Sequence, residues 1–151
     1  MPIRLFQQTD RAEILRMRRA LWPDCGDDMH EFEMLQGQLA KPDAYAVFVF
    51  ARENGSLGGF IEMSIRDRVD GSFSERVGYI EGWYVDPDLR GKGIGRQLVE
   101  AGERWTRERG LTEIASDAEL ENEHSLSAHK ALGFKETFRL VHFLKQLPPK
   151  T

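Results

Sequence analysis

Apolar residues recur at two spacings along this chain of 151 residues, and each spacing predicts a different kind of element. Where apolar residues stand three or four positions apart, the pattern is that of a helix with one buried face. Four segments show it, marked by Ile14, Met17 and Leu21; by Phe32, Leu35 and Leu39; by Ile94, Leu98, Ala101 and Trp105; and by the range Ser125 to Leu132. Thr9 is the expected N-cap of the first helix, and Trp22-Pro23 is expected to end it. Gly110 and Gly133 stand at the expected C-caps of the third and fourth helices.

Runs rich in β-branched and aromatic residues predict the strands. They cover residues 3–6, 45–52, 57–66, 77–85, 112–116 and, as one or two strands, 134–147. Asn54-Gly55 and Asp70-Gly71 are turn signals that join the second, third and fourth runs into an antiparallel meander. A crossover from Val85 through one helix to Ile114 makes the two strands at its ends parallel neighbours, with a right-handed connection. The elements therefore predict a mixed α/β fold with a mostly antiparallel central sheet and about four helices.

Composition limits the class of protein. The chain has the length of one domain, without repeats or linker-like tracts, so we expect a single domain over residues 1–151. The longest apolar run, Ala44 to Ala51, is too short to span a membrane, and the N-terminus has no export signal, so a cytoplasmic protein with no membrane partner is expected. A net charge of −4 argues against a nucleic-acid partner and suits a cationic ligand.

The most specific chemical signal is the glycine-rich segment "LRGKGIGRQL" between a predicted strand and a predicted helix. The first amides of a helix have no intrahelical acceptor, and glycines let an anion approach them closely. Arg90, Lys92 and Arg96 add positive charge around Gly91, Gly93, Ile94 and Gly95. The segment therefore predicts a phosphate site.

Three phosphate-binding motifs compete for this loop. A Walker A loop needs Lys followed by Ser or Thr after its last glycine, and Gly91-Lys92-Gly93 breaks that pattern. A dinucleotide fingerprint needs a third glycine where Arg96 stands, although Asp117 lies at a suitable distance for a ribose-binding acid, so this alternative stays open. The third motif, R-x-x-G-x-G, is matched from Arg90 to Gly95.

That third motif, with the order of elements, resembles the GCN5-related N-acetyltransferase (GNAT) superfamily, in which it binds the pyrophosphate of acetyl-CoA. The resemblance implies that the strand ending at Val85 and the strand 112–116 splay apart to admit the pantetheine arm. It implies cofactor contacts from Trp83, Tyr84, Val85, Arg90, Gly91, Lys92, Gly93, Ile94, Gly95, Arg96 and Asn122. In the segment "AHKALGF", His129 replaces the tyrosine that often protonates the leaving thiolate, so either its imidazole or a water would supply that proton.

A closer resemblance is to the aminoglycoside 6′-N-acetyltransferases of Gram-negative bacteria, carried by "LWPDCGDDMH", "YIEGWYV", "ASDAELEN" and "HKALGF". It implies that Trp22 walls the acceptor site and that Glu81 and Asp117 bind the amines of the drug. Arg68 stands where these relatives have a tyrosine lining the site, and Phe138 where a glutamate can reach the drug. The resemblance also implies a homodimer paired through its C-terminal strands.

The acceptor residues can also be judged from the sequence itself. Glu81 interrupts an apolar strand, where a carboxylate is unfavourable unless paired or catalytic, and Asp117 follows a strand at its carboxyl end, where ligands collect. Their ordinary roles would be an outward-facing strand residue and a turn or capping aspartate, while Trp22 would plug the core and His129 would lie on a helix surface.

We therefore expect direct acetyl transfer, with Glu81 as general base, Asp117 orienting the amine, and backbone amides at Trp83 to Val85 polarising the acetyl carbonyl. The four histidines are scattered, so no metal is expected. Two further hypotheses stay open: a GNAT enzyme acting on another amine (a polyamine, a peptide N-terminus or a lysine), favoured by Arg68 and Phe138, and a non-catalytic acyl-CoA-binding module.

Overall fold

The predicted strands form one five-stranded sheet with the order β1-β2-β3-β4-β5 in the computed structural model, which describes residues 2–150. The strands are β1 (Ile3–Leu5), β2 (Tyr45–Ala51), β3 (Leu57–Asp67), β4 (Arg76–Val85) and β5 (Ile114–Ser116). Neighbours from β1 to β4 are antiparallel, and β5 runs parallel to β4. The meander and the parallel crossover predicted from the sequence are confirmed, as is the mixed α/β class.

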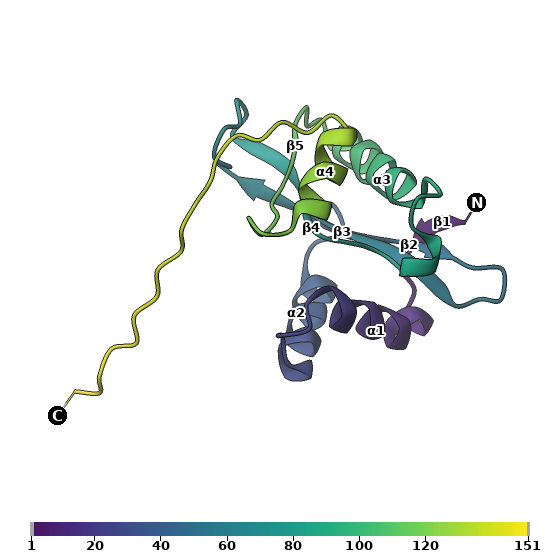
Figure 1. Cartoon of the computed structure of the whole chain (residues 1–151), viewed down its shortest axis with the longest axis horizontal. Coiled ribbons are helices and arrows are strands. Elements are labelled where there is room, and N and C mark those ends of the chain that lie inside the picture. Colours follow the sequence, from purple (N-terminus) through teal and green to yellow (C-terminus); the bar gives the residue numbers. More distant parts are fainter. Residues whose placement is uncertain (1, 151) are drawn as a thin grey trace. The chain divides into compact units, whose positions relative to one another are not determined.

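The helices are α1 (Arg11–Leu21), α2 (Asp27–Leu39), α3 (Ile94–Glu108) and α4 (Glu123–Ala131), with short 3₁₀ turns at Gln8–Asp10 and Pro87–Leu89. Figure 1 shows α1 and α2 on one face of the sheet and α3 on the other. The chain divides after Asp117 into two compact units, each described by itself below, with α4 in the second. A single domain over residues 1–151 stays a prediction.

The core of the first unit lies on each face of the sheet, because alternate strand residues point to opposite sides. On the α1 side it contains Ile14, Met17, Met34, Val49, Leu57, Phe60 and Tyr84. On the other side α3 buries Leu98, Val99, Ala101 and Trp105, as its predicted apolar face requires. Gly102 of α3 lies against Met63 of β3, where a Cβ would come within 2.8 Å of the sulfur. These contacts fix the position of β4 between its neighbours.

Two helix predictions need correction. Thr9 is not the N-cap of α1, because it lies inside the 3₁₀ turn Gln8–Asp10 and the helix begins at Arg11. In α2 the apolar residues expected in the core are exposed: Phe32 to 55%, Leu35 to 51% and Leu39 to 77%. The helix instead turns the stripe of His30, Met34 and Gly37 toward the sheet, because His30 meets a buried arginine of α1 and Gly37 leaves room for the ring of Tyr45.

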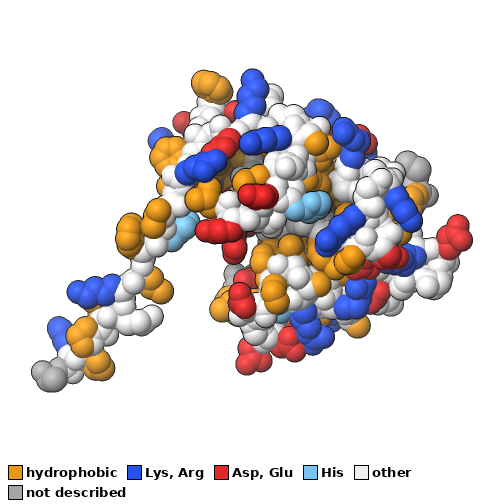
Figure 2. Space-filling view, viewed as in Figure 1, with side chains coloured by type: hydrophobic (Ala, Val, Ile, Leu, Met, Phe, Trp, Pro, Cys, Tyr) orange, Lys and Arg blue, Asp and Glu red, His pale blue; other side chains and the backbone are white. Residues whose placement is uncertain are grey.

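The second unit holds α4, which ends at Gly133 in the left-handed conformation (φ +91°) as predicted. The one or two strands predicted over residues 134–147 do not form. A strand needs a neighbour for its backbone groups, and the described residues of this unit contain no other strand. Figure 2 shows hydrophobic side chains along this segment, and those that are strongly exposed are Phe138, Leu140, Val141, Phe143, Leu144 and Leu147.

Within residues 2–150 no helix has the length and apolar character to cross a membrane.

Candidate active site

A β-bulge sets the position of Glu81. Across β3 and β4, Glu62 faces Gly82 and Met63 faces Ile80, so Glu81 is an extra residue without a partner opposite it. A bulge re-aims the side chain of the bulged strand and increases the local twist. Here it places the carboxylate of Glu81 beside Ser64 of β3, whose hydroxyl donates to its Oε2 at 2.6 Å. The acidic residue that interrupts the apolar pattern of this strand, Glu81, is therefore the extra residue of a β-bulge.

Glu81 belongs to a group that we call the open cluster: Ser64, Arg66, Tyr79, Glu81 and Asp117. Arg66 donates from Nε to Glu81 Oε2 at 2.9 Å and from an Nη to Oε1 at 2.6 Å, a bidentate ion pair. Its guanidinium also lies 3.7 Å from the centre of the Tyr79 ring. The Tyr79 hydroxyl donates to Asp117 Oδ2 at 2.6 Å. The two predicted carboxylates are thus linked through an arginine and a tyrosine.

The electrostatics of the open cluster keep its donors protonated. The hydrogen bond to Glu81 raises the pKa of Arg66 despite partial burial, and the charge of Asp117 acts in the same direction. Burial, then the bond to Asp117, raises the pKa of Tyr79, so its phenol donates to Asp117 at neutral pH. Side-chain exposure is 46% for Arg66 and 26% for Glu81. Solvent and a ligand can therefore reach the carboxylate of Glu81.

Trp22 lies next to Glu81 because Gly82 makes room for it. A Cβ on Gly82 would come within 2.6 Å of the Trp22 ring, so the indole packs directly on the backbone of β4. Trp22 also stacks with His30 at a centroid distance of 6.4 Å, and the Arg18 guanidinium lies 4.8 Å from the centre of the Trp22 ring. The structure therefore brings together three of the predicted acceptor residues, Trp22, Glu81 and Asp117.

A second group, the buried cluster, comprises Arg18, His30, Tyr45 and Glu62, with the exposed Glu33 beside it. Arg18 donates to Glu62 Oε2 at 3.3 Å and to His30 Nδ1 at 3.3 Å, and it pairs with Glu33. The Tyr45 hydroxyl also donates to Glu62. Burial raises the pKa of Glu62, opposed by the Tyr45 hydrogen bond and the Arg18 charge. His30 Nε2 is buried with no hydrogen-bond partner among the described residues.

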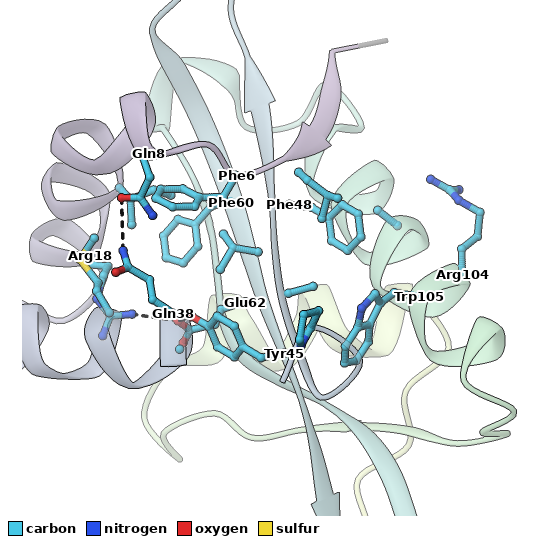
Figure 3. A pocket seen from close by; sticks show the side chains of 18 of the residues that line it. Phe6, Gln8, Arg18, Gln38, Tyr45, Phe48, Phe60, Glu62, Arg104 and Trp105 are labelled. Carbon is cyan, nitrogen blue, oxygen red and sulfur yellow. Dashed lines mark hydrogen bonds and ion pairs between the residues drawn. The ribbon is translucent and has the colours of Figure 1, made fainter. Parts of the chain in front are cut away.

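A cavity lies at this buried cluster. It has a volume of about 640 Å³, and Arg18, Tyr45 and Glu62 contribute to its wall (Figure 3). Glu81 and Asp117 do not line it, so the open cluster lies outside this cavity.

The edge of β4 beyond Ile80 is open on the side of β5. The parallel pairing joins only Gly78, Tyr79 and Ile80 to β5, while β4 continues to Val85. The pairing with β5 therefore ends before Glu81.

The glycine loop follows that edge, and its glycines have different structural roles. Gly91 (φ +77°) and Gly93 (φ +83°) adopt the left-handed conformation, with open space where a Cβ would stand. At Gly95 a Cβ would instead come within 3.2 Å of the Trp83 ring, whose Nε1 donates to the Gly95 carbonyl at 3.2 Å. The first amides of α3 therefore face outward beside the open end of β4, next to the exposed Lys92.

Arginine–carboxylate pairs hold the base of the loop. The buried carboxylate of Asp86 accepts from Arg16 at 3.0 Å and from Arg52 at 3.0 Å. Burial on its own raises the pKa of Asp86, but these hydrogen bonds outweigh it and leave the pKa below its ordinary value. Arg90 donates from Nε to the Val85 carbonyl at 2.9 Å. A preorganised loop of this kind suits an anion.

Three further predicted site residues are described by their contacts within their own units. Asn122 is the N-cap of α4, where its side chain accepts from the Ser125 amide at 3.0 Å. His129 Nδ1 lies 2.7 Å from the Ser125 carbonyl, so this nitrogen carries the proton. Both belong to the second unit. Arg68 lies in the turn after β3, with the left-handed backbone (φ +50°) that is uncommon for a bulky residue.

The sequence analysis missed Ser64, Arg66 and Tyr79. A signal for them exists in the strand pattern, because polar residues alternate in β3 at Glu62, Ser64 and Arg66 and must share one face. Among residues 2–150 no group of three or more potential metal ligands gathers.

Known proteins match this arrangement. Residues 11–134 match the acetyltransferase (GNAT) family, and the chain belongs to this family. It is 43% identical over 148 residues to the aminoglycoside N(6′)-acetyltransferase type 1 of Klebsiella aerogenes, covering 96% of each chain. It is 41% identical over 148 residues to the protein of the same description from Stenotrophomonas maltophilia, covering 97% of this chain and 94% of that one.

Solved structures agree with the sequence relatives. The apo aminoglycoside 6′-N-acetyltransferase AAC(6′)-IG of Acinetobacter haemolyticus has a TM-score of 0.88 at 32% identity, over 98% of this chain and 100% of that one. AAC(6′)-Iy in complex with a bisubstrate analogue, CoA-S-monomethyl-acetylneamine, has a TM-score of 0.86 at 36% identity, over 96% and 97%. The fold and the family predicted from the glycine loop are confirmed.

Proposed function

We propose that this protein transfers the acetyl group of acetyl-CoA to the 6′-amino group of an aminoglycoside. The proposal is supported by relatives of that description at about 40% identity over nearly the whole chain. The observation that carries it is the open cluster, which places two carboxylates and the Trp22 ring where β4 parts from β5, next to an anion-binding loop. A polycationic amine is the ligand that two carboxylates recognise.

The donor is proposed to bind along the splay and the glycine loop. The open edge of β4 at Trp83, Tyr84 and Val85 would hold the pantetheine arm as an added strand. The amides at the start of α3, with the charges of Arg90, Lys92 and Arg96, would hold the pyrophosphate. Acetyl-CoA supplies an activated thioester, and the residues of this chain position it. Asn122 remains a proposed contact of the pantetheine arm.

The acceptor is proposed to bind with Trp22 as a wall and with Glu81 and Asp117 on its ammonium groups. A protonated amine cannot attack a thioester, so Glu81 takes a proton from it, directly or through one water. The amine nitrogen then bonds to the acetyl carbon, the carbon–sulfur bond breaks, the nitrogen gives up its second proton to solvent, and the sulfur takes a proton from His129 or from water. Backbone amides near Trp83 to Val85 stabilise the developing negative charge on the acetyl oxygen.

The proposal extends to the assembly of the protein and its location in the cell. The exposed apolar side chains of residues 134–147 support a C-terminal pairing of two copies, since obligate interfaces bury apolar area. We propose a homodimer in the cytoplasm, where acetyl-CoA is available. Sedimentation of the full chain and of a variant with Phe143→Ser and Leu147→Ser distinguishes a dimer from a monomer.

A second candidate is acetylation of a different amine, such as a polyamine, a peptide N-terminus or a lysine. It is favoured by Arg68, a cation in the turn that follows β3, and by Phe138 in place of an acidic residue. This alternative keeps the donor site and the chemistry of Glu81 and changes only the acceptor.

One experiment separates these functions. Release of free thiol from acetyl-CoA is measured against kanamycin, tobramycin, spermidine and a lysine-containing peptide, and the product is located by NMR. We expect release with the aminoglycosides and acetylation at the 6′-nitrogen. Release with spermidine or peptide alone would favour the second candidate. Tight CoA binding without thiol release in any case would contradict both.

A further inference from the structure

Arg66 has no place in the proposed chemistry, although it makes the strongest contacts in the open cluster. Its two hydrogen bonds, at 2.9 and 2.6 Å, use both oxygens of Glu81. These are the oxygens that a substrate ammonium would need, because an ionised carboxylate binds ammonium only through them. In the structure the acceptor carboxylate is therefore already paired with a cation from its own chain.

The guanidinium also covers the other surface that would attract a cation. It lies 3.7 Å from the centre of the Tyr79 ring, whose hydroxyl bonds Asp117. A cation over an aromatic face and beside two carboxylates is held by the same forces that select an aminoglycoside amine. Arg66 thus imitates the ligand in position as well as in charge.

Arg66 can leave this position for water. Its side chain is 46% exposed, so water solvates the separated charge and offsets part of the lost contacts. Glu81 stays oriented when it loses the arginine, because the Ser64 hydroxyl still donates to its Oε2 at 2.6 Å. The site therefore has a displaceable cation and a fixed anion.

We propose that Arg66 acts as an internal counter-cation of the acceptor site. It occupies the ammonium subsite of Glu81 until an acceptor amine displaces it. This inference rests on the proposed function, since it concerns the acceptor side of the same site. Displacement opposes the binding of every amine, so an acceptor must gain enough from its other contacts, such as those of a polycation with Asp117, to offset the exchange with Arg66.

The test is the affinity for an amine without acetyl-CoA, measured by calorimetry with tobramycin and with spermidine as probes. Arg66→Gln keeps a polar side chain and removes the charge. We expect it to bind both probes about two- to fivefold more tightly than the wild type, the range set by an exposed ion pair. The variant should also show a steeper loss of affinity with salt, because Glu81 and Asp117 then face the probe without compensation.

Two variants serve as controls. Arg76→Gln removes an arginine of the same strand pair, which lies 3.8 Å from Asp67 and is 58% exposed, and should leave both affinities unchanged. Arg66→Lys restores the charge without the bidentate geometry and should return affinity toward the wild-type value. A purely structural role for Arg66 would not produce tighter binding or this rescue.

Weaker or unchanged binding by Arg66→Gln would overturn the inference, and so would the absence of binding of either probe to both proteins. If the amines bind as expected but no thiol is released from acetyl-CoA, the proposed function fails while Arg66 keeps its assigned role. The two failures are therefore distinguishable.

Discussion

The buried cluster and the open cluster have the same kinds of residues on one face of one sheet, and differ in their contact with water. Each pairs an arginine with a glutamate that also accepts from a hydroxyl group. The Arg18 side chain is 1% exposed and that of Glu62 is 11%, against 46% for Arg66 and 26% for Glu81. A buried pair cannot exchange its partner without leaving a charge in the protein interior, whereas an exposed pair can.

This difference assigns separate roles to chemically similar groups. The buried cluster holds α1 and α2 on the sheet and supports Trp22 through Arg18 and His30. The open cluster presents carboxylates that a ligand can reach. Chemically similar groups on one sheet therefore differ in whether a ligand can reach them.

The largest expected effect is on catalysis, and it distinguishes Glu81 of the open cluster from Glu62 of the buried cluster. Glu81→Gln removes the proposed base, so we expect kcat/KM for an aminoglycoside to fall by about 10²- to 10⁴-fold. The free energy of unfolding should change by less than about 1 kcal/mol, because the pair is exposed. Glu62→Gln should keep the wild-type kcat/KM. Thiol release and urea unfolding of both variants check this, and equal activity of Glu81→Gln across the pH range would exclude Glu81 as the base.

Arg18 tests the structural role of the buried cluster. Arg18→Met leaves Glu62 buried without its cation, and we expect the free energy of unfolding to fall by about 3–5 kcal/mol. Adding Glu62→Leu removes the unpaired charge and should recover most of the loss. Urea titration of the single and double variants measures both values. A double variant less stable than the single one would contradict this interpretation.

The two glycines of β4, Gly78 and Gly82, allow the two faces of the sheet to be tested separately. A Cβ at Gly82 would meet the Trp22 ring, and a Cβ at Gly78 would overlap Thr106 of α3. Both alanine variants should lose about 1–3 kcal/mol of unfolding free energy through overpacking. Gly82→Ala alone should raise KM for the acceptor, about tenfold if the shift of Trp22 removes about 1.4 kcal/mol of binding. An equal rise in Gly78→Ala would mean that KM reports general destabilisation.

The smallest effect comes from the two tyrosines, which allow the same substitution in each cluster. Tyr79→Phe removes one hydrogen bond to Asp117 and should raise KM for the acceptor about fivefold, equivalent to about 1 kcal/mol, with little change in stability. Tyr45→Phe leaves Glu62 with one donor fewer in a buried site and should reduce stability by about 1–3 kcal/mol without changing KM. The reversed pattern would contradict the assignment of the clusters.

Much of the fold was predictable because its signals are local. The turns at Gly55 and Gly71 have φ of +89° and +86°, and the meander follows from them. The apolar face of α3 is also as predicted, because an amphipathic helix of 15 residues has one way to bury it. The pattern of α2 was misleading, because the orientation of the helix depends on the contact of His30 with a buried arginine of α1, which its own apolar spacing does not show. The prediction of C-terminal strands was wrong for a similar reason, because a strand forms only beside a partner strand.

The candidate site was predictable in part. Glu81 stands out as a charge in an apolar strand and Asp117 as an acid after a strand, and both signals are visible in the chain. Their connection through Arg66 and Tyr79 depends on the register of β3 against β4 and on the parallel pairing of β5. Register is set by three-dimensional pairing, so the alternation in β3 places Ser64 and Arg66 on one face but does not show which residues of β4 they meet.

The claim that the open cluster receives the acceptor is tested most directly by a crystal structure of the full chain with CoA and tobramycin. We predict an ammonium nitrogen of the drug about 3 Å from an oxygen of Glu81 or Asp117, with a ring of the drug against Trp22 and the pyrophosphate on the amides of Gly93 to Arg96. A drug bound in the cavity beside Glu62, with the Arg66–Glu81 pair intact and no amine on either carboxylate, would contradict it.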